Sequence, residues 1–162
     1  MLILGVDPGL SATGYGLIAY ENGRLRLVEG GVIRSHDKDS LERRVGDIFS
    51  GIGEVLDEFH PEVLSMEEIY SHIKHPKTAV IMAHARGAIL AAADVRQIPV
   101  CHYAATMIKQ SLTGNGRAPK EQVQRMVFSL LDLKAPAKPF DTFDALAAAL
   151  CHINQNVRVS IS

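Results

Sequence analysis

The sequence has 162 residues, of which 47% are hydrophobic and 22% are charged, and its formal net charge is −1. These values are typical of one soluble globular domain, and they do not indicate a globally basic nucleic-acid-binding protein, although local patches count for more than net charge. No continuous apolar stretch reaches the roughly 18 residues of a membrane span, and no basic segment with a cleavage site marks a signal peptide. With only Cys101 and Cys151 as cysteines, we expect a cytoplasmic protein with reduced thiols.

The first third of the chain predicts an antiparallel meander. Leu2–Val6 is a continuous apolar run that is typical of a central strand. Gly14–Tyr20 and Arg24–Ile33 follow as two further strands, and the Glu21-Asn22-Gly23 connection contains an Asn-Gly pair, which is a strong hairpin signal.

The rest of the chain predicts helices that alternate with strands. Apolar residues recur every three or four positions from Leu41 to Phe59, where Asp39 and Glu42 form a plausible capping pair and Pro61 ends the helix. Two short strands and four more helices are expected: strands Glu62–Met66 and Pro99–Tyr103, and helices Lys77–Gln97, Ala104–Leu112, Lys120–Leu131 and Asp141–Asn154, with a linker at Lys134–Pro139. The expected class is α/β, with a mixed five-stranded sheet of antiparallel meander plus parallel strands and helices on both faces.

Acidic residues stand at the ends of these elements. Asp7 ends the first strand before the Pro8-Gly9 turn, Glu67 and Glu68 end the fourth strand, and Asp141 and Asp144 lie three residues apart at the start of the last helix. Each has a purely structural alternative: Asp7 could accept backbone N–H bonds in its turn, the glutamates could form a solvated strand end, and the two aspartates could cap the helix.

The four positions Asp7, Glu67, Asp141 and Asp144 together favour a metal site. Carboxylates gathered within several ångströms repel one another unless cations neutralise them. Ligands that are all oxygen suit Mg²⁺ or Mn²⁺, and two such ions activate a water and stabilise the leaving oxygen of a phosphodiester. Rigid element ends would keep such ligands in place.

Four sequence segments carry a family likeness: GVDPGLSATGYG, MEEIY, IKQSLTGNGRAPKEQVQRMV and FDTFDALAAALCH. In this order, and over nearly the whole chain, they resemble the RuvC family of Holliday junction resolvases. The resemblance implies an RNase H-like nuclease domain over residues 1–156, with 157–162 as a short tail. It also implies a homodimer that cuts four-way DNA junctions with Mg²⁺, or with Mn²⁺ as a substitute, in homologous recombination and DNA repair, beside a branch-migration motor complex.

The resemblance also implies roles for single residues. The family's acidic tetrad falls on Asp7, Glu67, Asp141 and Asp144, although some relatives carry His in place of the first helical acid. Glu67 is preferred to Glu68, because strand alternation should turn Glu68 away. The basic positions beside the scissile strand fall on Lys109 and Lys120, and the expected DNA contacts are Tyr70, Lys74, Lys77, Lys109, Arg117, Lys120 and Arg125.

The charge pattern agrees with a DNA-binding surface. The segment from Lys109 to Arg125 has four basic residues against Glu121, a local charge of +3, which would bind phosphates in a salt-dependent manner. The alternative for these lysines and arginines is simple solubility, and Tyr70 could be an ordinary packed aromatic. The small residues of Lys77–Gln97 let another backbone come close, so we expect this helix to pack on the sheet or on a partner subunit.

Two other functions would also account for parts of this sequence. An ATPase of the actin-like superfamily would use Asp7-Pro8-Gly9 and Thr13 as a phosphate loop, but that fold needs two domains and a second loop, for which 162 residues are too few. A junction-binding protein without catalysis would gain nothing from four carboxylates near phosphates.

Overall fold

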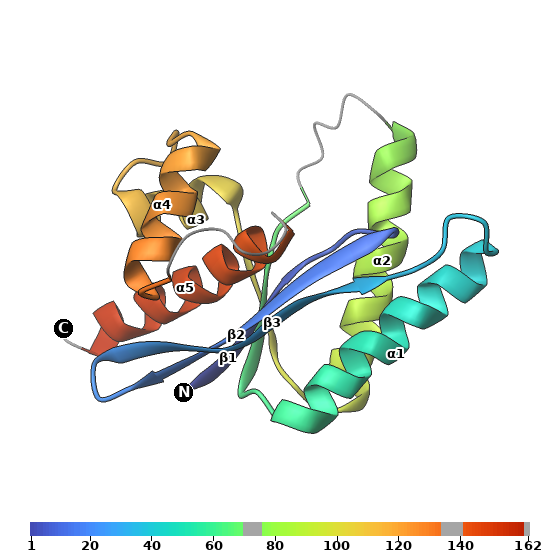
Figure 1. Cartoon of the computed structure of the whole chain (residues 1–162), viewed down its shortest axis with the longest axis horizontal. Coiled ribbons are helices and arrows are strands. Elements are labelled where there is room, and N and C mark those ends of the chain that lie inside the picture. Colours follow the sequence, from blue (N-terminus) through green and yellow to red (C-terminus); the bar gives the residue numbers. More distant parts are fainter. Residues whose placement is uncertain (70–75, 134–140, 161–162) are drawn as a thin grey trace.

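The structure is a computed structural model that describes residues 1–69, 76–133 and 141–160. Its centre is one five-stranded sheet in the order β3-β2-β1-β4-β5 (Figure 1). The strands are β1 Leu2–Asp7, β2 Ala12–Glu21, β3 Arg24–Arg34, β4 Val63–Glu67 and β5 Val100–Tyr103. The first three pair antiparallel, whereas β4 is parallel to both β1 and β5. The predicted mixed sheet is therefore confirmed.

Helices cover both faces of this sheet, as predicted. They are α1 Leu41–Phe59, α2 Pro76–Val95, α3 Ala105–Thr113, α4 Lys120–Leu130 and α5 Asp141–Ser160. Figure 1 shows α1 and α2 on one side of the sheet and α3, α4 and α5 on the other. Each side has its own hydrophobic core, and β1 contributes to both, because Ile3 packs toward α5 while Leu4 and Val6 pack toward α1 and α2.

Helix α5 lies very close to the sheet. Ala145 and Ala149 are fully buried, and the Ser65 hydroxyl of β4 donates a hydrogen bond of 2.8 Å to the Ala148 carbonyl. Gly5 of β1 faces the helix backbone so closely that a Cβ atom there would lie 1.8 Å from the Ala145 carbonyl oxygen. All residues from Ala145 to Ile153 are buried, so this part of the helix is enclosed on every side.

Two predicted helix ends are corrected by the structure. The N-cap of α1 is Ser40, in extended backbone conformation, and not Asp39, whose amide donates to the His36 carbonyl in the preceding turn. The expected pairing of Asp39 with Glu42 as a cap is therefore wrong. Helix α5 continues to Ser160, six residues past its expected end at Asn154, whereas the expected linker Lys134–Pro139 lies outside the described residues.

Helix α2 leaves an apolar face uncovered. Val80, Ile81 and Val95 are 57%, 46% and 71% exposed, while Ala85, Ile89 and Ala92 are fully buried against α1 and the sheet. By length and composition α2 is apolar enough to cross a membrane, but the core helices of soluble proteins meet the same criterion. The expectation that no segment reaches this threshold holds only for uninterrupted apolar runs, because Lys77, Arg86 and Asp94 interrupt the apolar sequence of α2.

Candidate active site

The ends of β1 and β4 and the first turn of α5 meet at one hollow. Its volume is about 390 Å³, and Asp7, Glu67 and Asp144 all line it. Strand alternation explains why: Gly5 and Ser65 face α5 in neighbouring parallel strands, so the residues two positions later, Asp7 and Glu67, emerge on the same face. The structure thus brings three of the four predicted acids together. The side chain of the fourth, Asp141, is not among those described.

A second hollow adjoins the first and supplies positive charge. It has a volume of about 240 Å³ and shares Glu67 and Asp144 with the first hollow, while Lys109 of α3 and Lys120 of α4 line its other side. The Lys120 ammonium donates to Asp144 Oδ2 at 2.7 Å, and both side chains remain accessible at 55% and 39% exposed. The two lysines predicted beside the scissile strand therefore lie next to the acids.

The electrostatics of Glu67 fit a place for cations. Desolvation raises the pKa of the Glu67 carboxyl above 4.5, the negative charge of Asp144 raises it further, and the positive charges of Lys109, Lys120 and Arg86 oppose the rise. A carboxyl with a raised pKa gains from any added positive charge, because that charge relieves the repulsion from its acidic neighbour.

The donor set suits a hard divalent cation. Asp7, Glu67 and Asp144 offer carboxylate oxygens at one hollow, which is the ligand type that Mg²⁺ and Mn²⁺ prefer. Among the side chains that the structure describes, no three His, Cys, Asp or Glu residues are close enough to hold a metal as they stand. The described acids would therefore have to adjust around bound ions, and Asp144 would exchange its Lys120 contact for them.

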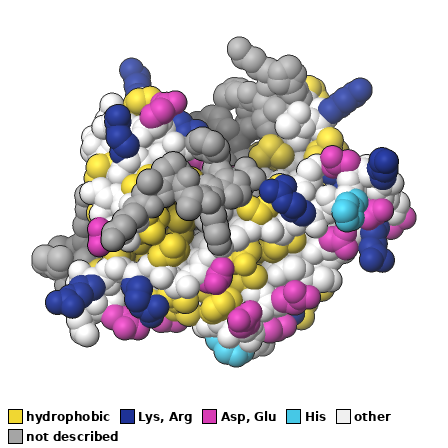
Figure 2. All heavy atoms as spheres, in the orientation of Figure 1, with side chains coloured by type: hydrophobic (Ala, Val, Ile, Leu, Met, Phe, Trp, Pro, Cys, Tyr) yellow, Lys and Arg dark blue, Asp and Glu magenta, His cyan; other side chains and the backbone are white. Residues whose placement is uncertain are grey.

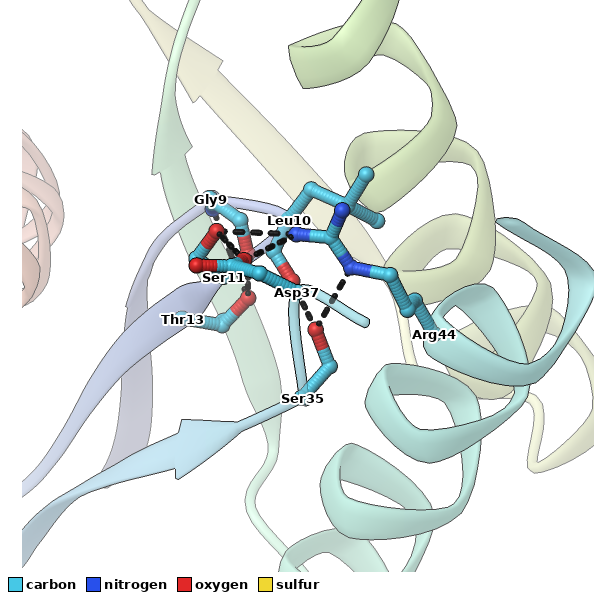
Figure 3. Close-up of polar contacts among 7 residues, drawn as sticks. All are labelled: Gly9, Leu10, Ser11, Thr13, Ser35, Asp37 and Arg44. Atoms are coloured by element: carbon cyan, nitrogen blue, oxygen red, sulfur yellow. Dashed lines mark hydrogen bonds and ion pairs between the residues drawn. The ribbon is translucent and has the colours of Figure 1, made fainter. Parts of the chain in front are cut away.

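The turn after Asp7 is fixed by a polar network (Figure 3). Thr13 Oγ1 donates to the Gly9 carbonyl at 2.7 Å, and Ser35 Oγ donates to the Leu10 carbonyl at 2.6 Å. From α1, Arg44 donates to the Ser11 hydroxyl and to Asp37, both at 2.8 Å. Thr13 is fully buried and its hydroxyl is engaged within the turn, which argues against the phosphate loop of an actin-like ATPase.

The other predicted DNA-contacting residues are spread around the molecule. Lys77, Arg117 and Arg125 have exposed side chains at the start of α2, before α4 and within α4, and none of them lines either hollow. Tyr70 and Lys74 lie outside the described residues. Among the described side chains visible in Figure 2, lysines and arginines are scattered beside acidic side chains rather than gathered in one broad patch.

Two features of the site differ from the sequence analysis. Glu68 lines the first hollow as well, because β4 ends at Glu67 and alternation no longer governs the next residue, although Glu68 does not line the hollow with the lysines. Arg86 of α2 also lines the first hollow and was missed. A signal was present, since Arg86 is the only arginine in a helix otherwise rich in alanine.

Comparisons with known proteins agree with this geometry. The RuvC family, described as Crossover junction endodeoxyribonuclease RuvC, matches residues 3–152. The protein of that name from Rhodopirellula baltica is 45% identical over 149 residues, which cover 92% of this chain and 84% of the relative. That from Moorella thermoacetica is 44% identical over 152 residues, 94% of this chain and 90% of the relative.

Solved structures give the same result for the fold. The structure of Thermus thermophilus RuvC in complex with Holliday junction substrate superposes with a TM-score of 0.92 at 35% identity, over 99% of this chain and 97% of that one. The yeast mitochondrial Holliday junction resolvase Ydc2, at 14% identity and a TM-score of 0.69, shares the fold. The predicted RNase H-like fold is confirmed, and the chain belongs to the RuvC family of crossover junction endodeoxyribonucleases.

Proposed function

We propose that this protein is a metal-dependent endonuclease that resolves four-way (Holliday) DNA junctions during homologous recombination and DNA repair. The observation that carries the proposal is the convergence of Asp7, Glu67 and Asp144 on one hollow, beside the lysines of a second. The relatives support it, because their shared name is that of a junction-cutting nuclease and one is described in complex with a Holliday junction.

The acids would hold the metal and the lysines would face the phosphate. We assign two Mg²⁺ ions per subunit to Asp7, Glu67, Asp144 and Asp141, with Mn²⁺ as a substitute. When bound, such ions lower the pKa of water and offset the charge on the leaving oxygen. Water attacks the phosphorus in line, the bond to the 3′ oxygen breaks, and the products are a 5′-phosphate and a 3′-hydroxyl.

The lysines would act on the charge that develops at the phosphoryl group. Lys120 already donates to Asp144 at 2.7 Å, and Lys109 lines the same hollow, so both ammonium groups are within reach of a phosphate that contacts the acids. A preorganised positive charge near the transition state lowers the barrier without reorganisation of solvent. Tyr70, Lys74, Lys77, Arg117 and Arg125 are proposed to bind the junction arms.

Two subunits are proposed to act together. The exposed apolar residues of α2, Val80, Ile81 and Val95, are suited to burial against a second copy of the chain. A symmetric dimer would place two sites on strands of like polarity and give paired nicks. We further propose that the protein works in the cytoplasm, beside a branch-migration motor complex.

The proposal is tested with a synthetic four-way junction and a linear duplex of equal length, each with Mg²⁺ or with a chelator. We expect paired cuts in the junction alone, and only with Mg²⁺. Asp7→Asn should abolish cutting while junction affinity is kept, whereas Asp39→Asn, the same change at an exposed position in the turn before α1, should cut normally. Equal cutting of both DNAs would reject junction selectivity, and cutting by the Asp7→Asn protein would reject the metal site.

A further inference from the structure

Arg86 reaches from α2 to the ends of two strands. Its Nη1 donates a hydrogen bond of 2.6 Å to the backbone carbonyl of Glu67, and its Nη2 lies 2.5 Å from Nδ1 of His102 on β5. The same guanidinium lines the hollow that holds Asp7, Glu67 and Asp144. One side chain therefore touches the backbone of a predicted metal ligand and the neighbouring strand at once.

The contact falls at the last residue of β4. Glu67 is the last residue of β4 and pairs with Tyr103, and the Glu68 amide donates to the Tyr103 carbonyl at 2.9 Å. The Glu67 carbonyl points to the other side and is bound by Arg86 instead. Arg86 thus binds the last carbonyl of β4, at Glu67, whose carboxylate must stay beside Asp144.

The geometry requires the fork of an arginine. Two separate nitrogens of one planar group reach two acceptors on different strands, which a lysine ammonium on a flexible stem does not reproduce. His102 Nδ1 can accept only while its ring is neutral with the hydrogen on Nε2. Desolvation lowers the pKa of His102, and the charge of Arg86 lowers it further, so the acceptor form is favoured.

We infer that Arg86 is a positioning residue for DNA cleavage, which holds the end of β4, and with it the Glu67 carboxylate, in place by bridging the Glu67 carbonyl and His102. This inference rests on the proposed nuclease function. Two other roles are possible for such an arginine in principle: contact with a DNA phosphate, which depends on charge, and general support of α2, which affects stability but not cleavage.

Arg86→Lys separates these roles because it keeps the charge and loses the fork. We expect its single-turnover cleavage rate, at saturating junction and Mg²⁺, to fall by about 10- to 100-fold, the usual effect of losing a group that orients a metal ligand. The dissociation constant for the junction should stay within about twofold of the original, and Arg86→Gln should behave in the same way.

The matched control is Arg96→Lys. Arg96, just after α2, also donates to a side chain and to a backbone carbonyl, namely both Asp57 carboxylate oxygens at 2.6 Å and Ala92 at 3.2 Å, but it does not line the hollows. We expect Arg96→Lys to lower the melting temperature and to leave the cleavage rate unchanged.

A measurement without metal or DNA completes the test. If Arg86 holds the strand end, amide hydrogen exchange of Glu68 should be faster in Arg86→Lys than in Arg96→Lys, because the end of β4 opens more often. The inference is overturned if Arg86→Lys cleaves at the original rate, if its only defect is weaker junction binding, or if Glu68 exchange is unchanged. If the unmodified protein does not cut junctions, the proposed function fails, and the exchange comparison still decides whether Arg86 secures β4.

Discussion

Gly5→Ala should separate α5 from the sheet. The new Cβ atom would lie 1.8 Å from the Ala145 carbonyl oxygen and 2.7 Å from its carbon, and real Cβ atoms are essentially never closer than 3.0 Å, so the helix backbone would have to retreat by at least 1.2 Å. Overpacking against a side chain costs about 1–3 kcal/mol. Because a helix backbone in a filled core cannot turn aside as a side chain does, we expect a loss of about 3 kcal/mol in the free energy of unfolding, the upper end of that range.

For a chain of this length, about 3 kcal/mol corresponds to a fall of roughly 6–12 °C in melting temperature. Ala145 follows Asp144 directly, so the displaced helix should also slow junction cleavage below the melting temperature. Urea unfolding and single-turnover cleavage measure the two effects. The matched substitution is Gly46→Ala on the exposed side of α1, where a Cβ meets nothing within 4 Å; it should stabilise by about 0.5–1 kcal/mol. A Gly5→Ala protein as stable as the original would refute the close packing of α5 on β1.

Three further predictions concern charge and hydrogen bonding. Glu67→Gln should abolish cleavage yet raise the free energy of unfolding of the metal-free protein at pH 7 by roughly 0.5 kcal/mol. Because the pKa of the Glu67 carboxyl is raised from 4.5, the ionised carboxylate destabilises the folded state above that pH and not below it. A gain in stability that persists at pH 3.5 would contradict this reasoning. Desolvation lowers the pKa of buried His152 from 6.5, so the free energy of unfolding should fall as the pH drops from 7.5 to 5.5. Urea unfolding should show a smaller fall for His152→Gln, and an unchanged fall for His36→Gln at an exposed position. Arg44→Met should lose the bonds to Ser11, Ser35 and Asp37, lower stability by about 1–2 kcal/mol and slow cleavage, and unchanged values of both would remove Arg44 from the support of the Asp7 turn.

The elements of the fold were predictable because each leaves a periodic pattern in its own sequence. Apolar runs and alternation predicted every strand to within about two residues, and Asn22-Gly23 predicted the hairpin, where both residues have positive φ. Helix ends were less predictable. Asp39 and Ser40 are both good N-caps by residue type, and the choice of Ser40 depends on the turn that holds the Asp39 amide.

How closely two elements pack against each other cannot be recognised from a comparable pattern in the sequence. In the sequence, Gly5 is one more residue of an apolar strand, although the lack of a side chain there lets α5 approach the sheet. Arg86 is the one arginine in an alanine-rich helix, and only the packing of α2 shows that its guanidinium reaches Glu67 and His102. Periodicity defines which face of its element a residue occupies, whereas contacts between elements depend on how those faces meet.

The meeting of Asp7, Glu67 and Asp144 at one hollow could be expected from the sequence, because it depends both on where each element ends and on which elements are neighbours. Asp7 and Glu67 each end a strand, and β1 and β4 are adjacent and parallel, so their carboxyl ends must meet at one edge of the sheet. Both follow by two positions a residue that faces α5, and Asp144 lies in the first turns of that helix. The site is therefore held by the parallel pairing and by the close approach of α5, and it tolerates the repulsion between Glu67 and Asp144 because neither backbone can move away.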